Sequence, residues 1–195
     1  TLAIASCLSI NAQTTNIFDD VIVPSPNHNY LEAALIQEGL DDDLQNLSAK
    51  LTIFAPTDDA FNALATALNT DINGLLQLSN LSDILLYHVL GSEVLSSSVT
   101  NGLVASPLST TNTIKMTKTT GGSVYANQAL VTTADINKDN GIVHITNSVL
   151  LPFETVIDVA LDNGFSSLAT AVITAELLPA LTDPLAKFTV FAPTN

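Results

Sequence analysis

Leu51-Thr-Ile-Phe-Ala-Pro-Thr-Asp-Asp-Ala-Phe61 decides the fold of this chain, because it leads an apolar strand through a proline into a helix. Pro56 has no N–H to donate to a sheet, so a strand over 51–56 must end there. Thr57 has a side chain that accepts a hydrogen bond from a free N–H in the first helical turn, where the two following aspartates suit the helix dipole. Phe61 then anchors the helix. The stretch therefore predicts a structural corner and not a catalytic site.

The first eight positions of this stretch return almost unchanged at the other end of the chain, over residues 188–195. Phe54 recurs as Phe191, and the same offset relates several leucines and alanines upstream of each copy. A repeat of this length corresponds to a whole domain and not to a solenoid unit. We therefore expect a complete domain over residues 13–153 and a truncated first part of a second copy over residues 154–195.

The first twelve residues carry no charge and resemble the back half of a secretory signal peptide. We expect residues 1–12 to be a remnant of that signal, and the protein to be secreted or displayed at the cell surface, with the periplasm as another possible destination. Ile4-Ala5-Ser6-Cys7 also resembles a bacterial lipoprotein processing box, which makes a lipid anchor at Cys7 the second interpretation. No other stretch of about 20 apolar residues predicts a membrane span.

The charge of the chain limits its partners. Nineteen acidic residues stand against five lysines and no arginine, which gives a net charge of -14. Nucleic acids and anionic membranes need a positively charged surface, so nucleic acids are excluded as partners and anionic membrane surfaces are disfavoured. The acidic residues are spread along the sequence and predict a solubilising surface.

Helical patterns precede strand patterns along the first copy, which predicts an α+β domain. Asn29 followed by Glu32 has the spacing of a helix N-cap, and Gly39 is suited to end that helix. From Val94 onward the pattern turns to strands, with a hairpin over 115–126 across two glycines. The remaining predicted strands cover 129–133 and 142–146.

Two further motifs occur after the stretch over residues 51–61. Tyr87-His88-Val89-Leu90 and Asn140-Gly-Ile-Val-His-Ile-Thr-Asn-Ser-Val-Leu-Leu-Pro152 follow the opening stretch in order. Together the three motifs resemble the fasciclin (FAS1) domain family. The resemblance implies helices packed on a wedge-shaped β-sandwich of two sheets, and a non-catalytic role in adhesion to an extracellular protein or polysaccharide. It also gives a structural role to Phe54, Pro56, Thr57, Phe61, Tyr87, His88, Asn140, Gly141 and His144, with His88 buried and hydrogen-bonded near the first motif.

The resemblance points to Asp135 and Ile136 as candidate binding residues. An Asp-Ile pair just ahead of the last motif is tied to integrin binding in animal fasciclin domains. The structural alternative is that the pair ends a strand and buries its isoleucine.

Enzymatic chemistry is not predicted. The chain has no Gly-x-Ser-x-Gly elbow, its single cysteine lies in the expected signal remnant, and its three histidines are not at metal-ligand spacing. We therefore expect no cofactor and no metal. Two alternatives to adhesion stay open: an exported domain that binds a small apolar ligand or lipid between helices and sheet, and a spacer domain in a larger surface protein.

Overall fold

The computed structural model describes residues 14–109, 113–151 and 165–175, together with residues 177, 189–191 and 193. The expected signal remnant, with Cys7, and most of the expected second copy lie outside the described residues.

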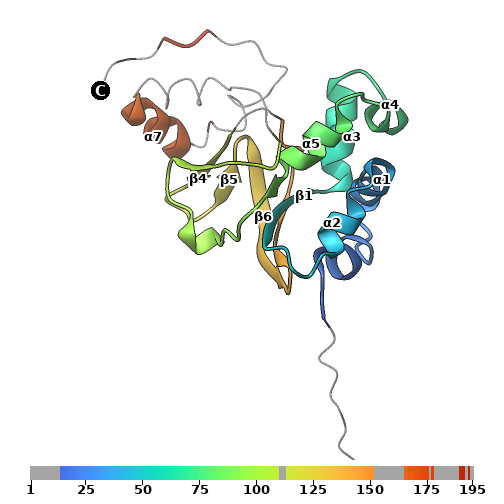
Figure 1. Cartoon of the computed structure of the whole chain (residues 1–195). Helices are drawn as coiled ribbons and strands as arrows, with labels where there is room; N and C mark the ends of the chain where they lie inside the picture. The colour runs from blue at the N-terminus through green and yellow to red at the C-terminus, as the bar shows by residue number, and fades with distance from the viewer. Residues whose placement is uncertain are drawn as a thin grey trace, which may run out of the picture.

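Six short helices precede most of the sheet, and local sequence signals set several of their ends. Gly39 ends the second of them in the left-handed conformation at φ 67°, as predicted. The Thr57 and Asp71 side chains each accept a hydrogen bond from the first turn of a helix. The helices are η1 (Phe18–Ile22, a π-helix), α1 (Asn29–Glu38), α2 (Asp41–Gln45), α3 (Asp58–Ala67), α4 (Ile72–Leu76) and α5 (Leu81–Tyr87). Helices α1 to α5 gather on one side of the molecule (Figure 1).

Seven strands form the sheet, which begins with β1 after α2. The strands are β1 (Leu51–Pro56), β2 (Val89–Leu90), β3 (Leu103–Ala105), β4 (Ile114–Lys118), β5 (Val124–Ala126), β6 (Ala129–Lys138) and β7 (Gly141–Thr146). A short 3-10 helix, η2 (Ser96–Ser98), lies between β2 and β3. The order of the seven strands across the sheet is β2-β1-β7-β6-β5-β4-β3. β1 runs parallel to β7, and the other neighbours are antiparallel.

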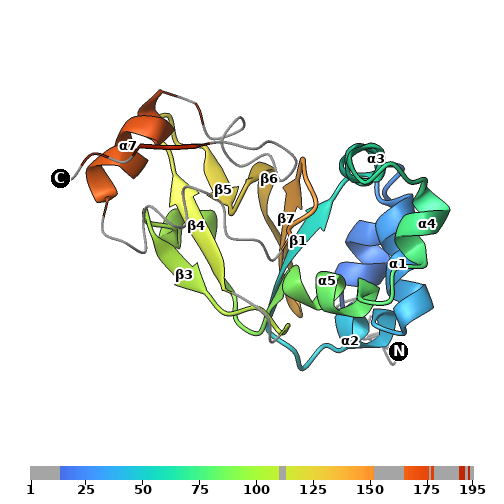
Figure 2. The same cartoon turned by 90° about the horizontal axis from the view of Figure 1, so that it is seen from above.

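The prediction of two separate sheets is wrong, because one continuous seven-stranded sheet is present. Strand β6 makes the sheet continuous, because it pairs with both β5 and β7. Its first residues pair with β5, and it then pairs with β7 over Val131 to Lys138. Two register irregularities between Val131 and Ile136 interrupt the second pairing, and irregularities of this kind bend a strand and increase its twist. The sheet therefore curls toward a barrel (Figure 2).

The curled sheet divides the buried apolar residues into two clusters. The helix-side core lies between the helices and one face of β1 and β7, and includes Ile53, Ala55 and Val143. The sheet-side core lies on the other face and includes Phe54, Tyr87 and eight further residues. All six residues of β1 are buried, so this strand separates the two cores and contributes to both.

The described part of the expected second copy holds one helix, α7 (Ser166–Thr174). It lies at the end of the molecule away from α1–α5 in both views (Figures 1 and 2). Phe191 is 91% exposed, whereas its repeat counterpart Phe54 is fully buried. Among the described residues, no helix is long and apolar enough to cross a membrane.

Candidate functional site

The first motif forms the corner that its sequence predicts. β1 ends at Pro56, and the Thr57 hydroxyl accepts a hydrogen bond from the Ala60 N–H at 3.4 Å. Phe61 is buried and meets Tyr30 edge to face, with ring centroids 6.4 Å apart. The corner joins β1 to α3 and places the Phe61 ring in the helix-side core.

Asp58 has a role that the sequence did not reveal. Its carboxylate accepts hydrogen bonds from the Tyr30 N–H at 2.9 Å and from the Asn29 side-chain amide at 2.8 Å. The prediction that Asn29 caps α1 is therefore wrong: His28 holds the cap position without a side-chain cap, and the acceptor comes from the start of α3. A cap supplied from 28 residues away leaves no local sequence signal.

Tyr87 connects α5 to the strand hairpins. Its hydroxyl donates to the Thr113 carbonyl at 2.8 Å and accepts from the Asn127 side-chain amide at 2.8 Å. Asn127 has φ 48° and lies in the two-residue turn between β5 and β6, where its side-chain oxygen also accepts from the Lys115 N–H. Sequence reasoning missed Asn127, although asparagine in a two-residue hairpin turn is a usable signal for positive φ.

His88 joins the other two motifs through separate groups. Its backbone carbonyl accepts from the Phe54 N–H at 2.9 Å, and its ring Nε2 accepts from the Leu150 N–H at 2.8 Å. The ring Nδ1 then donates to the Ile84 carbonyl at 2.7 Å. Complete burial lowers the pKa of His88 from 6.5 to about 4, against the opposing effect of the hydrogen bond to Ile84. The ring is therefore neutral at physiological pH and serves as a fixed connector.

Asn140 and Gly141 tie the last motif to the N-terminal helices. The fully buried Asn140 side chain accepts from the Ile17 N–H at 3.0 Å and donates to the Leu44 carbonyl at 2.6 Å. Gly141 has φ 148°, and a Cβ built on it would lie 2.1 Å from the Leu51 carbonyl oxygen. Only glycine allows β7 to begin this close to β1.

His144 lies beside Phe54 in the parallel pairing of β7 with β1, with ring centroids 5.6 Å apart. Its Nε2 donates to the Val94 carbonyl at 2.9 Å, and its Nδ1 accepts from the Asp135 N–H at 3.2 Å. Burial lowers the pKa of His144, and this effect outweighs the opposing effects of the Val94 carbonyl and the Asp135 charge. His144 thus fixes the backbone at the predicted binding pair.

Asp135 and Ile136 turn inward in part. Asp135 has φ 60° within the irregular part of β6, and its carboxylate accepts from the Ser96 N–H at 2.8 Å and the Ser96 hydroxyl at 2.5 Å. Partial burial works to raise the pKa of Asp135, but the two hydrogen bonds from Ser96 prevail and lower it, together with the charge of Lys118 and that of His144 when its ring is protonated. Ile136 is half-buried and packs on the helix-side core. The two side chains therefore lie against different parts of the domain.

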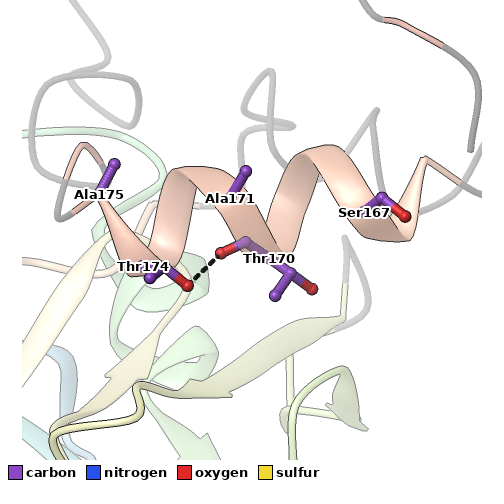
Figure 3. A pocket seen from close by; sticks show the side chains of 5 residues that line it. All are labelled: Ser167, Thr170, Ala171, Thr174 and Ala175. Carbon is purple, nitrogen blue, oxygen red and sulfur yellow. Dashed lines mark hydrogen bonds between the residues drawn. The ribbon is translucent and has the colours of Figure 1, made fainter.

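The hollows formed by described residues include a shallow depression and an apolar cavity. The shallow depression lies over α7 and is lined by Ser167, Thr170, Ala171 and Thr174 of that helix and by Ala175 directly after it (Figure 3). The apolar cavity lies between the helices and β1. No group of three or more metal-ligating side chains is found in the part of the chain that the structure describes.

Comparisons with known proteins agree with this geometry. A family described as the fasciclin domain matches residues 26–152. Protein sll1483 of Synechocystis is 37% identical over 114 residues, which cover 56% of this chain and 60% of that protein. Transforming growth factor-beta-induced protein ig-h3 of Sus scrofa is 36% identical over 134 residues, which cover 68% of this chain and 19% of that protein.

A solved structure shares the fold. The FAS1 domain pair of the insect cell adhesion molecule Fasciclin I matches with a TM-score of 0.52 and 22% identity, over 79% of this chain and 55% of that one. Likeness at this level of identity concerns the fold alone. The curled sheet, the flanking helices and the three joined motifs thus define an α+β domain of the FAS1 type.

The chain belongs to the fasciclin domain family. It spans 60% of the Synechocystis protein and about a fifth of the porcine protein that it matches.

Proposed function

We propose that this protein is a non-catalytic, exported adhesion module that binds an extracellular protein or polysaccharide through its exposed surface. One observation carries the proposal: the polar groups of the motifs are used inside the domain. The His88 and His144 rings, the Asn140 amide and the Asp135 carboxylate all make hydrogen bonds to segments distant in the sequence. A site that performs acid–base or nucleophilic chemistry needs such groups turned toward a substrate. Here they hold a scaffold together, which leaves recognition to the surface.

The two halves of the domain differ strongly in charge, and this difference favours the sheet half as the adhesive surface. Residues 14–92 carry eleven acidic side chains and one lysine, whereas residues 93–151 carry three of each. Cell and matrix polysaccharides are often anionic, so the helical half with its net charge of -10 is repelled by them. The sheet half is neutral overall and exposes Leu95, Val104 and Leu108.

The comparisons support the same conclusion. The insect protein that shares this fold, Fasciclin I, is a cell adhesion molecule. The uncharged first twelve residues support export, with the cell surface, the medium or the periplasm as the destination.

We also propose that residues 13–153 form one complete domain and residues 154–195 begin a second. The repeated motif supports this division, and so does the contrast between the buried Phe54 and the exposed Phe191. Tandem copies raise the effective concentration of weak binding surfaces, so an array of such domains adheres better than one.

A matched pair of substitutions tests which half adheres. Val104 on β3 and Ile36 on α1 are 54% and 53% exposed, so replacing either by serine removes a similar exposed apolar group. The whole chain is passed over immobilised matrix protein or cell-surface polysaccharide and its retention is measured. Val104→Ser should reduce retention and Ile36→Ser should not. Equal retention of both variants would contradict the sheet half as the binding surface, and no retention of the unaltered protein would contradict adhesion itself.

The predicted pair Asp135 and Ile136 needs a separate design, because Asp135 also holds Ser96. Asp135→Asn removes the charge and keeps the shape, while Ser96→Ala removes the internal partner and leaves the Asp135 carboxylate in place. If the carboxylate meets the partner, Asp135→Asn weakens retention and Ser96→Ala does not. Equal weakening by both changes would show a purely structural role.

A further inference from the structure

The apolar cavity on the helix side has the character of a binding site. Its volume is about 230 Å³, and it is a half-open cavity bounded by α1, α2, α5, β1, β2 and the segment after β3. Figure 2 shows α1, α2 and α5 on the side of β1 from which these residues come. Its lining residues are Leu35, Leu40, Asp43, Leu44, Asn46, Ala49, Leu51, Leu86, Val89 and Leu108.

The lining suits an apolar molecule. Eight of the ten side chains are aliphatic, and the two polar ones, Asp43 and Asn46, both come from the α2 segment and are exposed to solvent. Water enters a cavity only when it finds about two to four polar partners, and apolar cavities of about 150 Å³ stay dry and take up benzene. A cavity of this size and lining is therefore poorly filled by water.

The walls are held firmly around the space. Leu35, Leu44 and Leu51 are buried members of the helix-side core. At the rim, Leu108 is 48% exposed, and its backbone N–H donates to the Val89 carbonyl at 2.8 Å. The next residue donates to the Leu86 carbonyl at 3.3 Å. The cavity is thus preformed, so binding of a ligand requires little additional ordering of the protein.

We propose that this cavity binds a small ring-sized apolar molecule that carries one hydroxyl or N–H group, with its body among the leucines and its donor directed to the Asp43 carboxylate. At the packing density of protein interiors, about 0.74, the space holds about 170 Å³ of molecular volume, which fits one or two fused rings. Nine of the ten lining residues come from the helical half, and only Leu108 at the rim also belongs to the sheet half that is proposed to adhere.

Indole and indene form a matched pair of probes. Both are fused two-ring molecules of nearly the same shape, and only indole has an N–H. Each is added to the whole chain, and the unfolding midpoint is measured by scanning calorimetry. The midpoint should rise with the logarithm of probe concentration, by about 3–6 °C for each tenfold excess over the dissociation constant. Indole should bind about fivefold more tightly than indene.

Two pairs of variants locate the effect. Ala49→Leu fills the cavity and should abolish the shift for both probes, whereas Ala63→Leu adds the same side chain at an exposed position of α3 and should leave the shift intact. Asp43→Ala should remove the advantage of indole over indene, and Asp42→Ala, its exposed neighbour outside the cavity, should not. Methyl NMR titration of the unaltered protein should move the resonances of Leu35, Leu44 and Leu86 first.

Three results would overturn the proposal: no saturable shift with either probe, an undiminished shift in Ala49→Leu, or methyl changes spread away from the cavity. Should Ala49→Leu fail to fold, Ala49→Met and the methyl titration give the same decision. Adhesion is measured by retention and this site by probe binding, so failure of one leaves the other result unaffected.

Discussion

The stability of this domain should fall as the pH drops from 6.5 to 4, and His88 should account for a large share of the fall. In the unfolded chain this histidine has a pKa of about 6.5, whereas in the folded protein burial lowers its pKa to about 4. Between these two values the unfolded state binds the extra proton and the folded state does not. The contribution of the neutral ring is therefore complete above pH 6.5 and is lost progressively as the pH falls toward 4.

The magnitude follows from the two pKa values. Each unit of difference corresponds to about 1.4 kcal/mol, so the free energy of unfolding loses about 3 kcal/mol through His88 across this window. His28 and His144 have pKa values shifted downward in the same direction by burial, so they add to the slope. A substitution is needed to isolate the part that His88 contributes.

His88→Gln provides that isolation, since the glutamine amide has a donor and an acceptor at nearly the spacing of the two ring nitrogens but no proton to gain. At pH 7 the variant should be less stable by about 1–3 kcal/mol, because neither bond to Ile84 and Leu150 is reproduced perfectly. At pH 4.5 the difference from the unaltered protein should shrink by about 2–3 kcal/mol. Tyr87→Phe serves as the control: it removes a hydroxyl at the adjacent position and titrates nothing in this range.

Urea unfolding followed by far-UV circular dichroism measures these free energies, because the chain contains no tryptophan for fluorescence. The Tyr87→Phe difference should stay constant with pH while the His88→Gln difference shrinks. A His88→Gln difference that stays constant to within about 0.5 kcal/mol from pH 7 to pH 4.5 would refute the assignment of a depressed pKa to this ring.

Two further predictions concern the backbone and the repeat. Gly141→Ala should destabilise the domain by about 3 kcal/mol or more in the same urea assay, since the new Cβ would meet the Leu51 carbonyl at a positive φ. Gly121→Ala is the control: Gly121 has ordinary space around it, so this change should alter the free energy of unfolding by no more than about 0.5 kcal/mol. Equal effects of the two changes would contradict the close approach of β7 to β1. Limited proteolysis of the whole chain, followed by mass spectrometry, should cut within 154–195 before it cuts within 14–151, because Phe191 is exposed whereas Phe54 is buried. Resistance of residues 154–195 to the protease would count against their being an incomplete copy.

Sequence patterns predicted the features of the fold that depend on neighbouring residues. The threonine cap at the start of α3, the glycine end of α1 and the hairpin over 115–126 each rest on residues within a few positions of one another. Features that depend on distant partners were not predictable in the same way. The Asp58 carboxylate caps a helix that begins 29 residues earlier, and nothing near Asn29 signals this.

The prediction of the sheet architecture was wrong for the same reason, because strand pairing depends on residues that are distant in the sequence. A short strand of three to six residues carries little information about which strand lies on each side of it. The strand patterns therefore did not determine the number of sheets, and the expectation of two sheets came from the family resemblance. The parallel pairing of β1 with β7 links segments 90 residues apart, and its register is fixed by Gly141 and Asn140. These residues were recognisable as a motif, but the contact they make became apparent only in three dimensions.

The arrangement of the three motifs around β1 explains their structural role and supports the proposal that recognition lies elsewhere on the domain. β1 is buried on both faces, and its neighbours on either side are β2, which follows His88, and β7, which contains His144. Each motif therefore satisfies the backbone of another, and a buried polar group that loses its partner costs about 1–3 kcal/mol. A partner molecule that drew any of these groups outward would have to offset this loss with its own binding free energy. Binding at surface residues of the sheet half or in the preformed cavity breaks none of these hydrogen bonds, which is why we propose these two places for binding.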